Sequence, residues 1–238
     1  NFLLKIKDNK DFITARFRNV CGFSLSSSYE DVQKFLNSRS NSFFPSIKGD
    51  LNTACIVNLD PQNSSVPQDP FDIKDSEALN LTGFAYKKNS NKIYLGKYLE
   101  PRLIYTSENF FASKDKNSNR RTIHLGIDVF CKKNTKVFCP DYGEVVLVDN
   151  CQERLDYGGF IVLKHYTRKG SCYFSLFGHL DPKSIKLQIG QKVKKGKKLG
   201  KIGNFKVNGG WEPHLHIQLS LGLGQGKNWP GVCNSKEI

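Results

Sequence analysis

The stretch from residue 121 onward alternates short runs of β-branched and aromatic residues with glycine-containing turns. Nothing in this half has the spacing of apolar positions that a long amphipathic helix requires. Short strands joined by tight turns pair in antiparallel fashion. The strand-like runs are 143–148, 160–165 and 172–177, and the predicted turns are 158–159, 168–170 and 195–197. The pattern predicts a mainly β fold (β-rich α+β) with an antiparallel sheet at its core.

The first hundred residues have a mixed character. A helix is predicted near 28–36, because a serine precedes acidic residues in the first turn and apolar residues follow at helical spacing. The apolar run 54–59 predicts a buried strand, and the Pro- and Asp-rich stretch 60–70 predicts a loop. We assign residues 1–100 to a mixed α/β connecting segment and residues 101–238 to the β domain. Because the segment holds no histidine, we expect it to contribute no site residue.

The charge of the chain allows two interpretations. The 238 residues carry a formal net charge of +14, and eight lysines lie within 183–201. Such a cluster can attract nucleic acid or other anionic polymers, or it can be the solvated side of a strand–turn–strand. The second interpretation is favoured, because no aromatic residues alternate with the lysines to stack on bases. We therefore expect no nucleic-acid partner. Without an apolar run long enough to span a bilayer, we expect no membrane partner either.

The cysteines give an indication of the compartment. Their number, seven, is odd, and no pair has the Cys-x-x-Cys spacing, which argues against a zinc ribbon or a redox motif. Buried free thiols in a reducing compartment are favoured over the disulfides of an exported protein. We expect a cytoplasmic location, with the cell envelope as the alternative. Since the chain contains no methionine, even at its start, we also expect it to be an internal fragment of a longer protein.

Three of the five histidines fall into two motifs typical of metal sites. His124 and Asp128 are four residues apart in His-Leu-Gly-Ile-Asp, and His214 and His216 flank a leucine. On a strand alternate side chains share a face, so the rings of His214 and His216 project together while Leu215 points into the core. Two histidines and one aspartate match the ligand count of a catalytic zinc site, which keeps a fourth position for water.

Each of these motifs alone is weak evidence for a metal. Their combination in one β domain is stronger, because a fourth histidine, His179, lies between them in Phe177-Gly-His-Leu. The remaining histidine, His165, ends an apolar strand without a partner motif. We interpret His165 as structural.

Residues 121–220 resemble the lysostaphin and LytM family of zinc endopeptidases, segment after segment. The matching segments are 124–128 (His-x-x-x-Asp), 141–146 (Gly-x-Val strand), 157–162 (Tyr-Gly strand), 177–180, the glycine-spaced hairpin 189–200, and 214–216 (His-Leu-His). The resemblance implies a peptidoglycan endopeptidase-like domain with an open groove on an antiparallel sheet.

The same resemblance implies roles for individual residues. His124, Asp128 and His216 would bind one zinc ion per chain. His179 and His214 would be catalytic, orienting or deprotonating the attacking water and stabilising the oxyanion formed at the scissile carbonyl. The chain departs from the family pattern at Phe177, which replaces the usual tyrosine. If that tyrosine hydroxyl positions substrate in the family, this chain lacks it.

A narrower resemblance extends beyond these segments. Residues 15–60, 95–107, 120–128, 207–216 and 229–233 resemble the middle module of large bacterial fusions. In those fusions a peptidase-like domain lies between a kinase-like phosphotransferase domain and a class III aminotransferase. The resemblance implies covalently linked enzyme domains as partners.

Two functions follow as expectations. The first is a zinc-dependent metalloendopeptidase-like domain that hydrolyses a peptide or amide bond in a peptide or peptidoglycan-like substrate. The alternative is a non-catalytic, zinc-stabilised middle module of an aminotransferase/kinase fusion. His179 and His214 favour catalysis, because a scaffold needs neither. Phe177 and the expected reducing compartment favour the scaffold.

Overall fold

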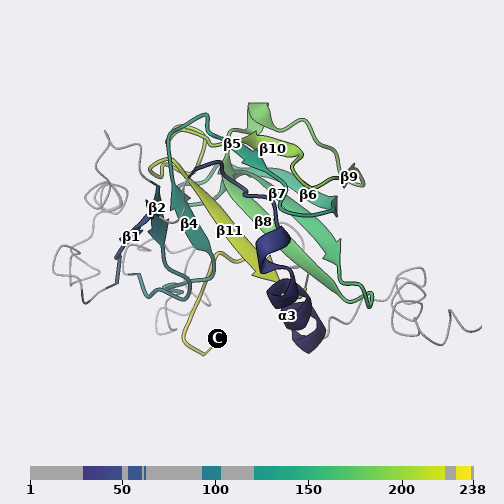
Figure 1. Ribbon diagram of the computed structural model, residues 1–238. Coiled ribbons are helices and arrows are strands. Elements are labelled where there is room, and N and C mark those ends of the chain that lie inside the picture. Colours follow the sequence, from purple (N-terminus) through teal and green to yellow (C-terminus); the bar gives the residue numbers. More distant parts are fainter. Residues whose placement is uncertain are drawn as a thin grey trace, which may run out of the picture.

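A computed structural model describes residues 29–49, 53–60, 62, 93–102, 121–222 and 229–236. Its centre is one eight-stranded sheet in the order β1-β2-β4-β11-β8-β7-β6-β9 (Figure 1). Neighbouring strands are antiparallel except β1 and β2, which are parallel. The strands are β1 (Cys55–Val57), β2 (Tyr94–Gly96), β4 (Ile127–Phe130), β6 (Gly143–Cys151), β7 (Gly158–Tyr166), β8 (Cys172–Leu180), β9 (Lys192–Val193) and β11 (His214–Ser220). The prediction of a mainly β fold is confirmed.

Two short strand pairs and little helix complete the described part. β5 (Lys136–Phe138) pairs with β10 (Lys198–Lys201), and β3 (Ile123–His124) pairs with β12 (Val232–Cys233). The helix predicted near 28–36 is confirmed as α3 (Tyr29–Ser38), with two acidic residues in its first turn. Short 3-10 turns span Ser40–Ser42 and Pro182–Ser184.

The core lies on both faces of the sheet, which explains the continuous apolar run in β7. Ile161 and Leu163 pack on one face, in a cluster that includes Val137 of β5 and Leu199 of β10. Phe160 and Val162 pack on the other face, with Trp229 from the C-terminal segment among their cluster. A strand that is covered on both faces shows no hydrophobic–polar alternation in its sequence.

The three strands predicted between residues 143 and 177 are confirmed as β6, β7 and β8. The turn predicted at 158–159 is wrong, because both glycines already belong to β7 and the turn precedes them. A Cβ on Gly158 would lie 2.2 Å from the carbonyl oxygen of Val207, and one on Gly159 would lie 2.6 Å from that of Leu180. These glycines serve close backbone packing, and Gly158 also has a positive φ of 61°.

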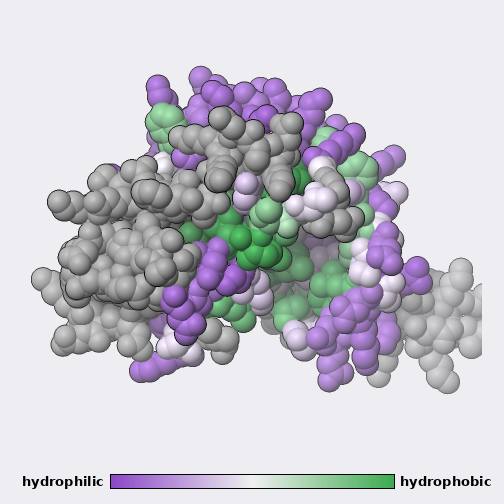
Figure 2. All heavy atoms as spheres, turned by 60° about the vertical axis from the view of Figure 1, so that its left-hand side comes forward, coloured by the Kyte–Doolittle hydropathy of each residue, from purple (hydrophilic) through white to green (hydrophobic). Residues whose placement is uncertain are grey.

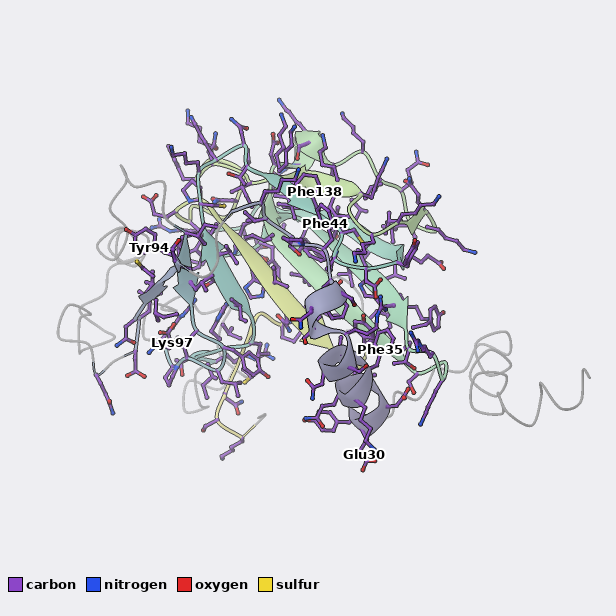
Figure 3. The ribbon with its side chains drawn as sticks, viewed as in Figure 1. Glu30, Phe35, Phe44, Tyr94, Lys97 and Phe138 are labelled. Carbon is purple, nitrogen blue, oxygen red and sulfur yellow. The ribbon has the colours of Figure 1, made fainter. Side chains whose placement is uncertain are left out.

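The segment after α3 fastens the helix to the rest of the chain. Arg39 forms an ion pair of 2.6 Å with Asp141, and the rings of Phe35 and Tyr173 lie 6.2 Å apart. Figure 3 shows Phe44 beside Phe138 of β5, with ring centroids 5.6 Å apart. α3 and residues 43–47 therefore pack on the β domain.

The β9 and β10 end of the molecule is strongly hydrophilic (Figure 2). Seven of the eight lysines within 183–201 are exposed there, and Lys201 is half-buried. The lysines form a solvated surface over a buried apolar layer that includes Val193 and Leu199. The expectation that no nucleic acid binds to them stays a prediction.

Part of the predicted connecting segment joins the sheet. β2 pairs with β4 and β1 pairs with β2, so residues 55–57 and 94–96 extend the sheet beyond β4. The division of the chain at residue 100 stays a prediction. No helix among the described residues is both long and apolar enough to cross a bilayer.

Phe177 provides a test of the core. Its side chain is fully buried in the cluster of Ile161 and Leu163. In Phe177→Tyr the added hydroxyl would be buried among apolar side chains, so we expect the free energy of unfolding to fall by about 1–3 kcal/mol. Urea denaturation measures this change. Phe205→Tyr, at a 62 % exposed ring, is the control and should leave the free energy of unfolding unchanged. Equal stability of Phe177→Tyr and wild type would show that a tyrosine fits this position.

Candidate metal centre

Three neighbouring strands of the main sheet and the short strand β3 bring the five predicted site residues together. Asp128 lies on β4 directly opposite His216 on β11. On its other side His216 lies opposite Gly178 of β8, one residue before His179. His124 ends β3, and His214 begins β11 on the same face as His216. All five side chains are at least 95 % buried.

The three expected ligands have the spacing that zinc requires. His124 Nε2 lies 3.0 Å from His216 Nδ1 and 3.3 Å from Asp128 Oδ1. His216 Nδ1 lies 3.1 Å from Asp128 Oδ1. In a tetrahedral zinc site with bonds of about 2.0–2.1 Å, ligand atoms are about 3.3–3.4 Å apart. The three atoms therefore form one face of a tetrahedron of nearly the right size, and they could hold a metal ion together.

Every ligand also has a partner for the atom that would point away from the metal. His124 Nδ1 lies 3.2 Å from the carbonyl oxygen of Lys97, and His216 Nε2 lies 3.1 Å from Gln218 Oε1. Arg102 Nη1 donates to Asp128 Oδ2 at 2.7 Å. An acceptor on one ring nitrogen fixes the proton there and leaves a lone pair on the other. These partners thus orient the ligand atoms toward one point.

His179 and His214 lie beside the three ligands with a common orientation. His179 Nδ1 donates to the carbonyl oxygen of Asn208 at 3.0 Å, and His214 Nδ1 donates to that of Glu212 at 2.6 Å. The two rings are 4.2 Å apart between centroids, and His214 Nε2 lies 3.6 Å from Asp128 Oδ1. With Nδ1–H engaged, each ring keeps an acceptor at Nε2. His179 has a positive φ of 60°, a conformation that is uncommon for a residue other than glycine.

Burial keeps the imidazoles of His124, His179 and His214 neutral. It lowers the pKa of His124 to about 4 and that of His179 well below its usual range. It also lowers the pKa of His214. Burial alone would raise the pKa of Asp128, but His124 and Arg102 outweigh it and hold that pKa well below its usual range. Because His124 is neutral at pH 7, Arg102 is the cation that keeps Asp128 ionised there.

The five residues line a cavity of about 470 Å³. Aromatic rings form part of its wall, and charged side chains stand around it. The ring of Tyr157 lies 5.3 Å from that of His216 and 5.8 Å from that of His179. The aromatic lining residues are Phe130, Tyr157, Trp211 and Trp229, and the further charged ones are Arg102, Arg121, Glu153, Arg154 and Asp156.

Several residues of the centre were not found from the sequence. Gln218 lies two residues after His216, so the period of two along a strand could have revealed it. Arg102 and the carbonyl group of Lys97 belong to no recognised motif. Lys97 directly follows β2, and the backbone N–H of Arg102 donates to the Thr122 carbonyl oxygen beside β3. His165 lies outside the centre: its Nε2 is 2.7 Å from Ser175 Oγ and its Nδ1 is 2.8 Å from the Tyr142 carbonyl oxygen.

Comparison with known proteins supports a metallopeptidase-type domain. Residues 122–228 match the model of peptidase family M23, a little under half of the chain. No curated protein sequence matches the chain.

Three similar solved structures illustrate the likeness. A zinc-containing peptidase from Vibrio cholerae is 28% identical (45% of this chain, 30% of that one, TM-score 0.35). The catalytic domain of lysostaphin from Staphylococcus simulans is 19% identical (60% and 89%, TM-score 0.39). A mutant of the catalytic domain of the prophage-encoded M23 protein EnpA from Enterococcus faecalis is 21% identical (54% and 90%, TM-score 0.36). The chain spans about a third of the length of the first two structures it matches.

The donor geometry predicts one tightly bound zinc ion per chain. His216→Ala removes one of three ligands and should abolish zinc retention, whereas His179→Ala leaves all three ligands and should keep the metal. Elemental analysis after dialysis against buffer measures the stoichiometry. Wild-type protein that holds no zinc and takes up none on addition would contradict the assignment of the ligands.

The neutral imidazoles predict how metal-free protein responds to acid. The pKa of His124 in the folded state is about 4, below its ordinary value of 6.5. The folded state is therefore more stable when this imidazole is neutral than when it is protonated. This contribution is complete above about pH 6.5 and is lost as the pH falls toward 4, because the unfolded state binds the proton first. Urea denaturation of metal-free protein at pH 7.5, 5.5 and 4.5 should show falling stability. His124→Gln should flatten that slope, and an unchanged slope would contradict the role of burial.

Proposed function

We propose that residues 101–238 form a zinc metallopeptidase-type domain that hydrolyses a peptide or amide bond. The observation that carries this proposal is the pair His179 and His214, which stand beside a complete set of three ligands without belonging to it. A structural zinc site is closed by four protein ligands. Here three ligands face a cavity, and two neutral imidazoles line the same cavity.

The ligand set fits zinc, so separate roles can be given to the metal and to the two additional histidines. Zinc held by His124, Asp128 and His216 would supply Lewis acidity and lower the pKa of a bound water toward neutrality. His214 and His179 would orient the attacking water, and each has an Nε2 that can accept a proton. After accepting it, the same nitrogen becomes a donor. It could then stabilise negative charge on the carbonyl oxygen or protonate the departing amine.

Fixed backbone contacts prepare both histidines for this work. The carbonyl oxygens of Asn208 and Glu212 hold the two Nδ1–H groups, so neither ring can flip without losing a buried hydrogen bond. Loss of such a bond costs about 1–3 kcal/mol. The low pKa values of the rings keep them as acceptors at neutral pH. The orientation needed for proton transfer is thus present before substrate binds.

We propose a short peptide of peptidoglycan type as the substrate. This rests on the resemblance of residues 121–220 to the lysostaphin and LytM family and on the match to peptidase family M23. A cavity of about 470 Å³ falls within the range of sites for small ligands. Phe177 does not line it, because its ring is buried in the core. Tyr157 supplies the phenol ring that stands beside the histidines instead.

The second candidate is a non-catalytic zinc-stabilised module between a kinase-like phosphotransferase domain and an aminotransferase. It is favoured by the deep burial of all three ligands, whose exposed fractions are 2–3 %. A metal in such a place stabilises the fold whether or not turnover occurs. The attachment to those enzymes rests on the narrower sequence resemblance of residues 15–60, 95–107, 120–128, 207–216 and 229–233.

Hydrolysis assays separate the two candidates. If catalysis operates, zinc-loaded wild type should cleave a glycine-rich or cell-wall-like peptide. His179→Ala and His214→Ala should each lower the rate by roughly a hundredfold or more while keeping the zinc. Mass spectrometry of a peptide panel measures cleavage. His165→Ala, outside the centre, is the control for general effects of losing a buried imidazole. A wild type with full zinc that cleaves no peptide would leave the structural module as the function.

A further inference from the structure

We propose that Glu100 and Arg102 are positioning residues of the metal centre, which hold the Asp128 carboxylate and set how strongly the site binds zinc. This inference rests on the proposed zinc site. Both residues precede the part of the chain that matches peptidase family M23, residues 122–228. The inference extends the centre into the segment at residues 93–102.

Arg102 connects two buried carboxylates. Its Nη1 donates to Asp128 Oδ2 at 2.7 Å, and its Nε donates to Glu100 Oε2 at 2.8 Å. The three side chains are at most 3 % exposed. The other oxygen of Asp128, Oδ1, faces the expected histidine ligands. It lies 3.3 Å from His124 Nε2 and 3.1 Å from His216 Nδ1. Arg102 thus engages one oxygen and leaves the other for the metal.

Glu100 is itself fixed from the far side. Its Oε1 accepts a hydrogen bond of 2.9 Å from the backbone N–H of Leu59, just beyond β1. Lys97 Nζ lies 3.8 Å from the same oxygen, but its side chain is 42 % exposed. The carboxylate therefore has a buried backbone partner and a guanidinium partner. Its position does not depend on the surface lysine.

Gly96 provides the space in which Arg102 reaches Asp128. On β2 it lies opposite Asp128 in the register with β4. A Cβ at this position would lie 2.7 Å from Arg102 Nη2 and 3.2 Å from the Asp128 Cβ. Gly96 is not among the described residues with positive φ, so its backbone would accept alanine. Glycine is needed at this position to leave room for the Arg102–Asp128 ion pair, and not to allow an unusual backbone conformation.

The charges of this group explain why Glu100 matters although it touches no ligand. A buried guanidinium close to the metal position would repel a divalent cation. Glu100 offsets that charge, so the three residues together carry one net negative charge, from two carboxylates and one guanidinium. Removing one partner of a buried ion pair leaves an uncompensated charge. Without Glu100 the negative charge of Asp128 would be cancelled by Arg102.

The test is the dissociation constant for zinc, measured by competition with a chromogenic chelator on the full chain. Glu100→Gln removes the offsetting charge at nearly constant shape. Arg102→Lys keeps a cation but loses the planar fork that reaches both carboxylates. Gly96→Ala displaces the guanidinium without touching any charge. We expect each variant to bind zinc about 10–100-fold more weakly than wild type, the usual scale for partners of metal ligands.

Arg39→Gln is the matched control. It breaks another ion pair between an arginine and a buried carboxylate, that of Arg39 with Asp141, which has no contact with the metal ligands. It should lower the melting temperature and leave the zinc dissociation constant unchanged. A second readout is the visible absorption spectrum of the cobalt-substituted protein, which reports ligand geometry. The spectrum should change in Arg102→Lys and Gly96→Ala but not in Arg39→Gln.

The outcomes are distinguishable from those of the proposed function. Wild type without zinc binding would contradict the proposed zinc site itself. The inference is overturned if wild type binds zinc and the dissociation constants of Glu100→Gln and Gly96→Ala lie within twofold of the wild-type value. Lower melting temperatures alone would show that the pair has only a structural role. If Arg102→Lys fails to fold, the other two variants decide, because neither removes a partner of Asp128.

Discussion

The metal centre depends on the pairing of β11 with β4 on one side and β8 on the other. That register places His216 opposite Asp128 and next to the strand end that carries His179. The same register directs Leu215 into the core, where it is fully buried. A shift by one residue would turn every side chain of β11 to the other face. The hydrophobic core therefore fixes the relative positions of ligands that are 88 residues apart in sequence.

Burial has two opposite electrostatic consequences at this centre. It makes the imidazoles better ligands and acceptors, because desolvation keeps His124, His179 and His214 neutral. It also makes an ionised Asp128 costly, so that the carboxylate needs the cation Arg102 beside it. The ligand atoms directed away from the cavity, His124 Nδ1, His216 Nε2 and Asp128 Oδ2, each have a backbone or side-chain partner. Such partners matter because an unpaired polar group costs more in a buried site than in water.

The sequence predicted those parts of the structure whose signals are local. The strands at 143–177 and the helix at 29–38 follow from composition and spacing over a few residues, and His-Leu-His on one face follows from strand geometry. The contact of Arg102 with Asp128 could not be predicted, because it depends on how residues 100–102 pair with residues 122–124 beside β3. The direction of Phe177 was equally hidden, since β8 is buried along its whole length and shows no alternation. The glycines at 158–159 were wrongly assigned to a turn, because glycine is typical both of turns and of strands that pack closely against another backbone.

The fixed charges bear on the choice between enzyme and scaffold. Glu100, Arg102 and Asp128 together contribute one net negative charge beside the ligand atoms. A divalent cation would leave the centre with a net positive charge facing a cavity. In a low-dielectric site such a charge favours negative charge developing on a carbonyl oxygen. A purely structural zinc centre gains no stability from an uncompensated charge that faces a cavity. In such a centre a fourth protein ligand would complete the coordination of the metal. The charge distribution and the two additional histidines therefore support the proposed hydrolytic function over the scaffold, because both could stabilise charge that develops during hydrolysis.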